Sequence, residues 1–274
     1  MVARVIRSGV LIVLTALTLT GCGGQVSKES PQDLNLLATG PDRNVLSAPR
    51  PFVSAALDAT GGLAAWEQCR KIEFQAAVTA CEREGSFYLT EHDFVLCPWS
   101  DAIQVTAHEP RANFTWQMVG GQYRAPQADP NLDVSPLKDV SGDYAGAVLQ
   151  IATAPVRMLD DRMGLTLAPA AVQIAGQWYL PIDAKHQARK AGAKEKAAAE
   201  PYWTQGIYYQ GQDRSLIDMI WLGNPAAQRF VIVRGYDYAR NAGNGVLIPT
   251  KIEVFHSDPD ANIGSRIALI DLRQ

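Results

Sequence analysis

The last seventy or so residues constrain the fold most, because one pattern recurs in them. Stretches with alternating apolar and polar residues are separated by short turns rich in Gly, Asn and Asp. Residues 202–210 and 215–222 flank one turn, residues 229–238 and 246–256 flank another, and 263–272 closes the chain. A period of two places one face of each strand against a core. Strand, turn, strand at regular spacing predicts a large antiparallel sheet.

Further strands are expected upstream. Residues 72–83 and 86–97 surround Glu84-Gly85, which predicts a hairpin. Alternation also runs from Ile103 to Ala107, from Phe114 to Met118 and, around Gly176, from Val172 to Ile182. These segments extend the predicted sheet toward the N-terminus.

Two segments have helical spacing instead. Apolar residues recur at helical intervals from Phe52 to Ile72, and Gly61-Gly62 interrupts them, which predicts a helix or a pair of helices. Residues 144–163 predict another helix, interrupted at Pro155, after a loop-like stretch at 126–142. Helices together with an antiparallel sheet indicate an α+β fold.

The N-terminus carries the signals of export. Arg4 and Arg7 precede an apolar run, Gly9 to Leu19, which is too short to span a bilayer that needs roughly 20 apolar residues. Leu19-Thr20-Gly21-Cys22 follows and resembles a lipobox, in which Cys22 is lipidated. Two acyl chains, with a third on the new amino group, would anchor the protein firmly. An ordinary signal peptide or an uncleaved membrane helix are the alternatives.

We therefore expect a signal peptide at 1–21, a lipid-anchored flexible tether at 22–51 and a single domain at 52–274. An Ala/Lys/Arg-rich segment at about 184–200 reads as an exposed insertion, with contact to anionic lipid as the weaker interpretation. Gly23 after the cysteine resembles the outer-membrane sorting address, which predicts an envelope lipoprotein facing the periplasm.

Charge and motifs exclude several function classes. The net charge of −3 argues against non-specific nucleic-acid binding, which needs a basic surface. The chain contains no G-x-S-x-G, H-E-x-x-H or G-x-G-x-x-G motif, and its four His lie far apart in the sequence. We therefore expect no catalytic residues, no metal and no cofactor. An exported hydrolase would need a nucleophile, a histidine and a carboxylate to converge.

Three cysteines other than Cys22 remain. If the chain reverses near Glu84-Gly85, Cys97 lies opposite residue 72 and therefore close to Cys69. A disulfide between Cys69 and Cys97 is one option in an exported protein, and buried thiols are the other.

Large apolar side chains on the predicted strands have two interpretations. They fill a core between sheet and helices, or some of them line a concave pocket for acyl chains, because apolar contact is non-directional. The candidate ligand-binding residues are Phe114, Trp116, Met118, Trp178, Leu180, Met219, Trp221, Phe230 and Ile232.

Short motifs resemble the LolA/LolB-type lipoprotein carriers over residues 52–274. They are Gly61-Gly62 with Trp66, Lys71-Ile72-Glu73-Phe74, the run from Gly176 to Pro181, and Ile248-Pro249-Thr250-Lys251-Ile252. The resemblance implies an unclosed barrel, a strongly curved antiparallel sheet with helices on its concave side. It also implies a hydrophobic cavity for acyl groups and, for the membrane-anchored branch, receipt of lipoproteins at the outer membrane. The segment 184–200 has no counterpart, and no arginine matches the one with which the soluble carriers hold their lid.

These observations favour a lipid-anchored envelope protein that binds or transfers an apolar, acylated ligand and catalyses no reaction. Its expected partners are the membrane, acyl chains and an envelope protein. The alternative is a structural lipoprotein that docks an envelope complex and has no ligand cavity.

Overall fold

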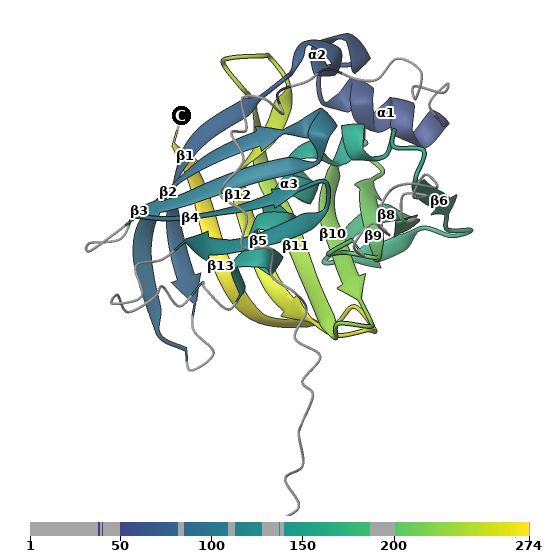
Figure 1. Cartoon of the computed structure of the whole chain (residues 1–274). Coiled ribbons are helices and arrows are strands. Elements are labelled where there is room, and N and C mark those ends of the chain that lie inside the picture. Colours follow the sequence, from purple (N-terminus) through teal and green to yellow (C-terminus); the bar gives the residue numbers. More distant parts are fainter. Residues whose placement is uncertain are drawn as a thin grey trace, which may run out of the picture.

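One antiparallel sheet of 13 strands dominates the computed structural model (Figure 1). The structure describes residues 50–81, 85–108, 113–127, 140–186 and 201–273, together with Ala38, Gly40 and Leu137. The expected α+β class and the curved, unclosed sheet are confirmed. The strands are β1 (Ile72–Cys81), β2 (Phe87–Cys97), β3 (Ala102–His108), β4 (Asn113–Val119), β5 (Gln122–Gln127), β6 (Met163–Leu167), β7 (Val172–Ile174), β8 (Gln177–His186), β9 (Gln205–Gly211), β10 (Ile217–Asn224), β11 (Arg229–Arg240), β12 (Leu247–Ser257) and β13 (Ile263–Arg273).

The strand order shows how the sheet is assembled. It runs β5-β4-β3-β2-β1-β13-β12-β11-β10-β9-β8-β6, and β7 pairs with β8 beside this path. Neighbours in sequence pair through tight turns, so the predicted hairpins β1–β2, β9–β10 and β11–β12 are confirmed. The first and last strands, β1 and β13, pair in the middle, with Val78 opposite Ile270. The sheet ends at β5 and β6 and does not close on itself.

The N-terminal helical segment forms two helices, which is one of the two arrangements that the sequence predicts. Helices α1 (Pro51–Ala59) and α2 (Leu63–Gln68) are separated at Gly61 and Gly62, which have φ values of 118° and 85°. Only glycine adopts such values without strain. The Trp66 indole Nε1 donates a 2.9 Å hydrogen bond to the Thr60 hydroxyl, which fixes the corner between the helices. A short 3-10 turn, η2 (Pro98–Ser100), joins β2 to β3.

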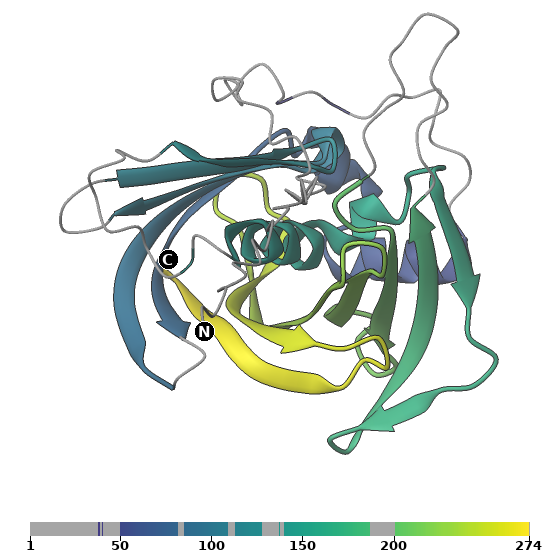
Figure 2. The ribbon, with the colours of Figure 1, turned by 60° about the horizontal axis from the view of Figure 1, so that its bottom comes forward.

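Helix α3 (Ser141–Arg157) lies inside the curve of the sheet, as Figure 2 shows. It follows edge strand β5 in the chain and precedes the opposite edge strand β6, so it crosses from one edge to the other along the concave side. The expected interruption at Pro155 is wrong. The helix continues to Arg157, because a proline in the last turn removes one backbone hydrogen bond while the buried contacts on every side persist. The helix also begins earlier and ends earlier than the predicted 144–163.

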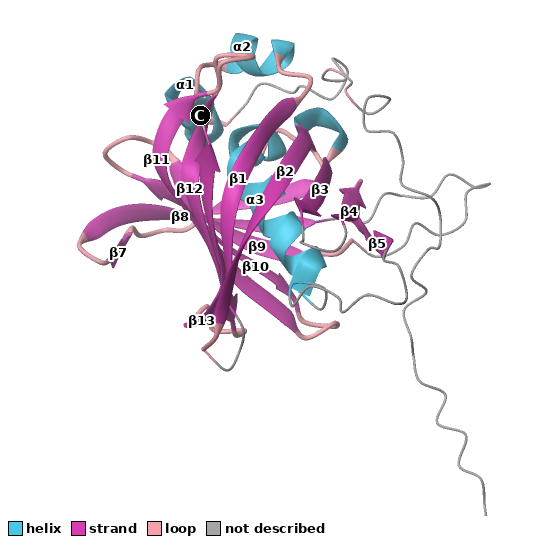
Figure 3. Cartoon of the chain, turned by 90° about the vertical axis from the view of Figure 1, so that its left-hand side faces the viewer, coloured by secondary structure: helices cyan, strands magenta, loops and turns pink. Residues whose placement is uncertain are grey.

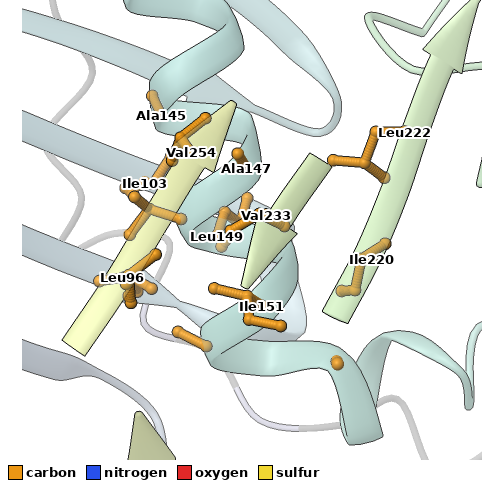
Figure 4. Packing of buried hydrophobic residues seen from close by; sticks show 14 of the residues in the cluster. Leu96, Ile103, Ala145, Ala147, Leu149, Ile151, Ile220, Leu222, Val233 and Val254 are labelled. Atoms are coloured by element: carbon orange, nitrogen blue, oxygen red, sulfur yellow. The ribbon is translucent and has the colours of Figure 1, made fainter. Parts of the chain in front are cut away.

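The core lies between α3 and the concave face of the sheet. Figure 4 shows Leu149 and Ile151 of α3 in the same cluster as Val233 of β11 and Ile220 of β10. The helix packs on β3 and β4 on one side and on β10, β11 and β12 on the other. Figure 3 shows the same enclosure from the side, with the strands wrapped around the helix. Helix α3 thus occupies the concave side, as expected, while α1 and α2 lie at one end of the sheet (Figure 1).

Several sequence predictions fall outside the described residues. These are the signal peptide at 1–21 with the lipidation site Cys22, most of the tether at 22–51, and residues 187–200 of the charged segment. Residues 184–186 of that segment belong to β8, so the strand extends into the predicted insertion. Of the helices that the structure describes, none has the length and apolar character needed to cross a membrane.

Candidate functional site

The concave face of the sheet, with α3 in it, is the candidate site. Every residue of α3 except Asp143 is buried, although a helix on a surface buries only one stripe. Six of the 17 residues of the helix are Ala or Gly, whose short or absent side chains leave parts of its surface close to the helix axis. The sheet therefore encloses the helix on nearly all sides.

Two glycines allow α3 to approach the segment that precedes β9. A Cβ at Gly146 would lie 2.4 Å from the Trp203 indole Nε1, and a Cβ at Gly142 would lie 2.5 Å from the Tyr202 hydroxyl. Neither distance is compatible with a real side chain. The backbone of Tyr202 donates to the Gly121 carbonyl at 2.8 Å, so this segment bridges toward the β4–β5 turn. Tyr202 and Trp203 thus hold α3 along the open side of the sheet.

Polar contacts inside the core fix the position of α3. The Tyr208 hydroxyl of β9 donates a 2.7 Å hydrogen bond to Gln150 Oε1, and the Tyr202 hydroxyl donates to Asp143 at 2.8 Å. The Tyr144 hydroxyl lies 3.0 Å from His92 Nδ1 on β2. Burial lowers the pKa of His92 to about 3, so this ring is neutral at physiological pH. Each bond contributes roughly 1 kcal/mol net and is replaceable by water when the helix moves.

A polar cavity of about 50 Å³ lies at the C-terminal end of α3. It lies between the helix, the β4–β5 turn and the end of β8, which is the region between the two sheet edges. Arg157 of α3 pairs with Asp101 at 3.0 Å, and both side chains are almost entirely buried. At about 10–15 Å³ per water, the cavity holds a few water molecules.

Four buried polar atoms around this cavity lack a hydrogen-bond partner in the described structure. They are Asp101 Oδ1, Arg157 Nε, His186 Nε2 and Trp203 Nε1. Buried polar atoms without a partner are rare, because each lowers the stability of the folded state by roughly 1–3 kcal/mol. Water in the cavity or the polar end of a bound molecule would satisfy them.

The cluster at this cavity combines a histidine with the ion pair between Arg157 and Asp101. Burial, followed by the positive charge of Arg157, lowers the pKa of His186 to about 4, so the ring is neutral and weakly basic. No group of three or more metal-ligating side chains occurs among the residues that the structure describes. The arrangement offers donors and an acceptor in a small space.

The nine candidate pocket residues do not come together in one place. Phe114, Trp116 and Met118 on β4 face α3 and belong to the main core, where Trp116 is 2% exposed. The Trp116 ring packs on Tyr144 of α3 at a centroid distance of 6.3 Å. These three therefore line the space that the helix occupies.

Four others form a second cluster on the opposite face of the sheet. Trp221 stacks on Phe230 with centroids 6.0 Å apart, and its indole Nε1 donates to the Asp258 carbonyl at 3.0 Å. The turn between β12 and β13 therefore covers this face. The members of the cluster are Met219, Trp221, Phe230 and Ile232.

The last two candidates lie on β8. Trp178 is 51% exposed, and Leu180 is partly exposed. Neither belongs to the buried core around α3. Their role in ligand binding stays a prediction.

The suggested bridge between Cys69 and Cys97 is absent from the structure, where both side chains are buried and not joined by a disulfide. Ile72 pairs with Leu96 and not with Cys97, so the predicted register is one residue out. A shift of one residue turns a side chain to the other face. Cys69 accordingly packs in the main core, whereas Cys97 packs with Ala102 in a separate small cluster.

Sequence reasoning missed the four residues around the polar cavity. They come from η2–β3, α3, β8 and the segment before β9, far apart in the chain. One signal was available, since Arg157 is the single basic residue in the apolar stretch that forms α3. A lone charge in an apolar helix needs a buried partner.

Comparison with known proteins gives structural neighbours only. No protein-family model matches the chain, and no curated protein matches its sequence. Six solved chains are similar, and three are described below.

A LolA superfamily protein from Nitrosomonas europaea is 11% identical, with a TM-score of 0.45 over 74% of this chain and 84% of that one. A domain described as an outer membrane lipoprotein-sorting protein, from Vibrio parahaemolyticus, is 6% identical, with a TM-score of 0.40 over 74% and 83%. A DUF1329 family protein from Desulfovibrio piger is 11% identical, with a TM-score of 0.42 over 82% and 92%. All three TM-scores are below 0.5, and these similarities carry no conclusion about ligands.

Proposed function

We propose that this protein is a lipid-anchored envelope protein that binds or transfers an acylated ligand on the concave face of its sheet, without covalent chemistry. The lipidated Cys22 would hold it in the outer membrane, facing the periplasm. The observation that carries the proposal is the position of α3. A small-residue helix fills the concave face of a sheet that stays open between β5 and β6.

An acyl chain would replace part of the apolar burial that α3 provides. Ala and Gly bury little apolar surface, so the helix loses less on leaving than a Leu-rich helix would. An acyl chain gains about 0.8 kcal/mol per buried CH₂, or on the order of 10 kcal/mol for a chain of ordinary length. Phe114, Trp116 and Met118 would then contact the ligand in place of the helix.

The contacts that hold α3 are also suited to reversible release. Tyr208–Gln150, Tyr202–Asp143 and Tyr144–His92 are hydrogen bonds that water replaces when the groups separate. The unpartnered polar atoms around the polar cavity lower the stability of the closed form at the C-terminal end of the helix. The buried ion pair between Arg157 and Asp101 also has to separate before the helix leaves, and it is the strongest of these contacts.

Hydrogen exchange followed by mass spectrometry tests this directly on residues 23–274. Addition of a fluorescent long-chain fatty acid is expected to speed amide exchange in α3, while β11 and β12 stay protected. Butyrate, which has the same head and almost no chain, is the control ligand. Binding that leaves the amides of α3 protected would contradict the displacement of the helix.

A matched pair of variants sharpens the test. Tyr208→Phe removes the hydrogen bond to Gln150, and Tyr209→Phe makes the same change on the opposite face of β9. Loss of about 1 kcal/mol from the closed form predicts roughly fivefold faster uptake of the probe for Tyr208→Phe and no change for Tyr209→Phe. Equal uptake rates in the two variants count against the proposal.

The anchor has its own test. Cys22→Ser is expected to abolish incorporation of labelled palmitate and to release the protein from the membrane fraction. If the variant still incorporates labelled palmitate, the lipid is attached to a residue other than Cys22.

A second candidate function is docking to an envelope complex. Phe87 and Leu89 near the tip of the β1–β2 hairpin are 74% and 72% exposed, and they lie on the same face of the strand. Exposed apolar pairs of this kind occur at contact sites. A lipid-free extract, no uptake of the fatty acid, and loss of a copurifying envelope protein on changing both residues to Ser would favour docking.

A further inference from the structure

A second cavity, of about 170 Å³, opens where β8, β10 and β11 meet beside the β9–β10 turn. It lies on the face of the sheet that points away from α3. Tyr208 contacts the helix, so Tyr209 points the other way, and the ring of Tyr179 packs edge-on against Tyr209 at 6.2 Å. This cavity is therefore separate from the concave face and independent of the acyl ligand proposed above.

Aromatic and planar polar side chains form its walls. The Arg234 guanidinium lies 5.1 Å from the centre of the Tyr236 ring, and the Tyr236 hydroxyl donates to Glu253 at 2.9 Å. The Tyr179 hydroxyl is hydrogen-bonded to Asp218 and to Arg234. Each side chain is held by a neighbour, so the walls are organised before any ligand arrives. Gln177 and Arg214 complete the rim.

An unpartnered acceptor lies in this cavity. Asp218 is more than nine-tenths buried, and its Oδ1 has no hydrogen-bond partner. A buried carboxylate oxygen without a donor is costly. A hydroxyl or amide donor from a ligand would satisfy it, while Arg214 and Gln177 offer donors to the acceptors of the same ligand.

Charge and size narrow the class of ligand. The cavity is lined by two arginines, Arg214 and Arg234, and by two aspartates, Asp218 and Asp237, so their formal charges cancel and favour neither an anion nor a cation. A neutral molecule with both hydroxyl donors and acceptors suits this lining. A cavity of about 150 Å³ holds one six-membered ring such as benzene, so 170 Å³ accommodates one ring whose substituents reach the opening.

We propose that this cavity binds one neutral, hydroxyl-rich ring of a saccharide, with Asp218 accepting from its hydroxyls and Arg214, Arg234 and Gln177 donating to its oxygens. Tyr236, which is partly exposed and lines the cavity, supplies the apolar surface against which the C–H face of a sugar ring packs. A single ring is a small ligand, and its expected dissociation constant is about 1 mM.

Titration of the full chain with methyl β-glucoside tests the proposal, in a detergent that has no sugar headgroup. The side-chain N–H signals of Arg214, Arg234 and Gln177 are followed by nuclear magnetic resonance. We expect saturable shifts in these signals with the glucoside and none with choline or inorganic phosphate. Asp218→Asn is expected to weaken binding roughly tenfold or more, because it removes the charged acceptor.

The control variant is Asp161→Asn, which makes the same change at an exposed position outside the cavity. It is expected to bind the glucoside as the unchanged chain does. Unchanged melting temperatures show that both variants fold. Absence of saturable shifts, binding of choline or phosphate in place of the glucoside, or equal affinity in Asp218→Asn would each overturn the proposal.

Discussion

The ion pair between Arg157 and Asp101 ties the C-terminal end of α3 to the turn before β3, and breaking it is expected to destabilise the protein strongly. Asp101→Asn is the cleanest perturbation. Asp101 has a φ of 50° and a ψ of 48°, and Asn tolerates this left-handed conformation as Asp does. The variant therefore removes the charge while keeping the shape and the backbone.

The expected magnitude follows from the geometry. At 3.0 Å and an effective dielectric constant of about 20, the attraction is on the order of 5 kcal/mol, which offsets the cost of burying both charges. Without its partner, the Arg157 charge stays buried, and such breaks cost about 3–5 kcal/mol. Arg157 also lies at the C-terminus of α3, where a cation gains up to about 1 kcal/mol from the helix dipole. We expect Asp101→Asn to cost about 3 kcal/mol, since the amide retains one hydrogen bond.

Urea unfolding and thermal melts measure the effect. About 3 kcal/mol corresponds to a melting temperature lowered by roughly 6–12 °C in a domain of this size. Arg157→Met alone should cost a similar amount, whereas the double variant should lose no more than about 1 kcal/mol, because it leaves no buried charge unpaired. The reasoning is refuted if Asp101→Asn costs less than about 1 kcal/mol, or if the double variant shows the sum of the two single losses.

Three further predictions concern packing and pH. Gly146→Ala should destabilise the protein by about 1–3 kcal/mol in urea, although Ala favours helices, because its Cβ would lie 2.4 Å from Trp203; a gain in stability would show that Trp203 moves freely. Trp116→Ser should cost more than about 3 kcal/mol and Trp178→Ser less than about 0.5 kcal/mol, since the first is 2% and the second 51% exposed; similar losses would contradict these placements. His92 and His186 have pKa values lowered by burial from 6.5 to about 3 and about 4, so the unfolded chain binds protons more readily. Their contribution is complete well above pH 6.5 and is lost as the pH falls toward the folded-state pKa values, by about 2.5 kcal/mol for each histidine at pH 4.5; urea unfolding of His92→Gln and His186→Gln should show a correspondingly smaller loss.

The local elements were predictable because each rests on a local signal. Alternation and turn residues predicted β9–β10 and β11–β12, and the two glycines predicted the break between α1 and α2. Such signals are read within a few residues of the chain. The curved sheet and the position of the helices followed from the resemblance of short motifs and were not visible in the periodicity.

The composition of the site was not predictable, for two physical reasons. All eight residues of β10 are buried, so its alternation does not tell which face meets α3. Met219 and Trp221 consequently looked equivalent to Phe114 and Trp116, although they lie on opposite faces. The polar cavity depends on Asp101, Arg157 and His186, which only tertiary folding brings together. Sequence spacing carries no information about such encounters.

The pairing of β1 with β13 has a consequence for biogenesis. Thr79 pairs with Leu269, so the middle of the sheet cannot form until β13 has left the ribosome. Before that moment, β1 and β12 each expose an unsatisfied backbone edge, and the concave wall lacks its central strand. The two halves of the sheet, β5 to β1 and β12 to β6, can therefore join only after β13 has been synthesised.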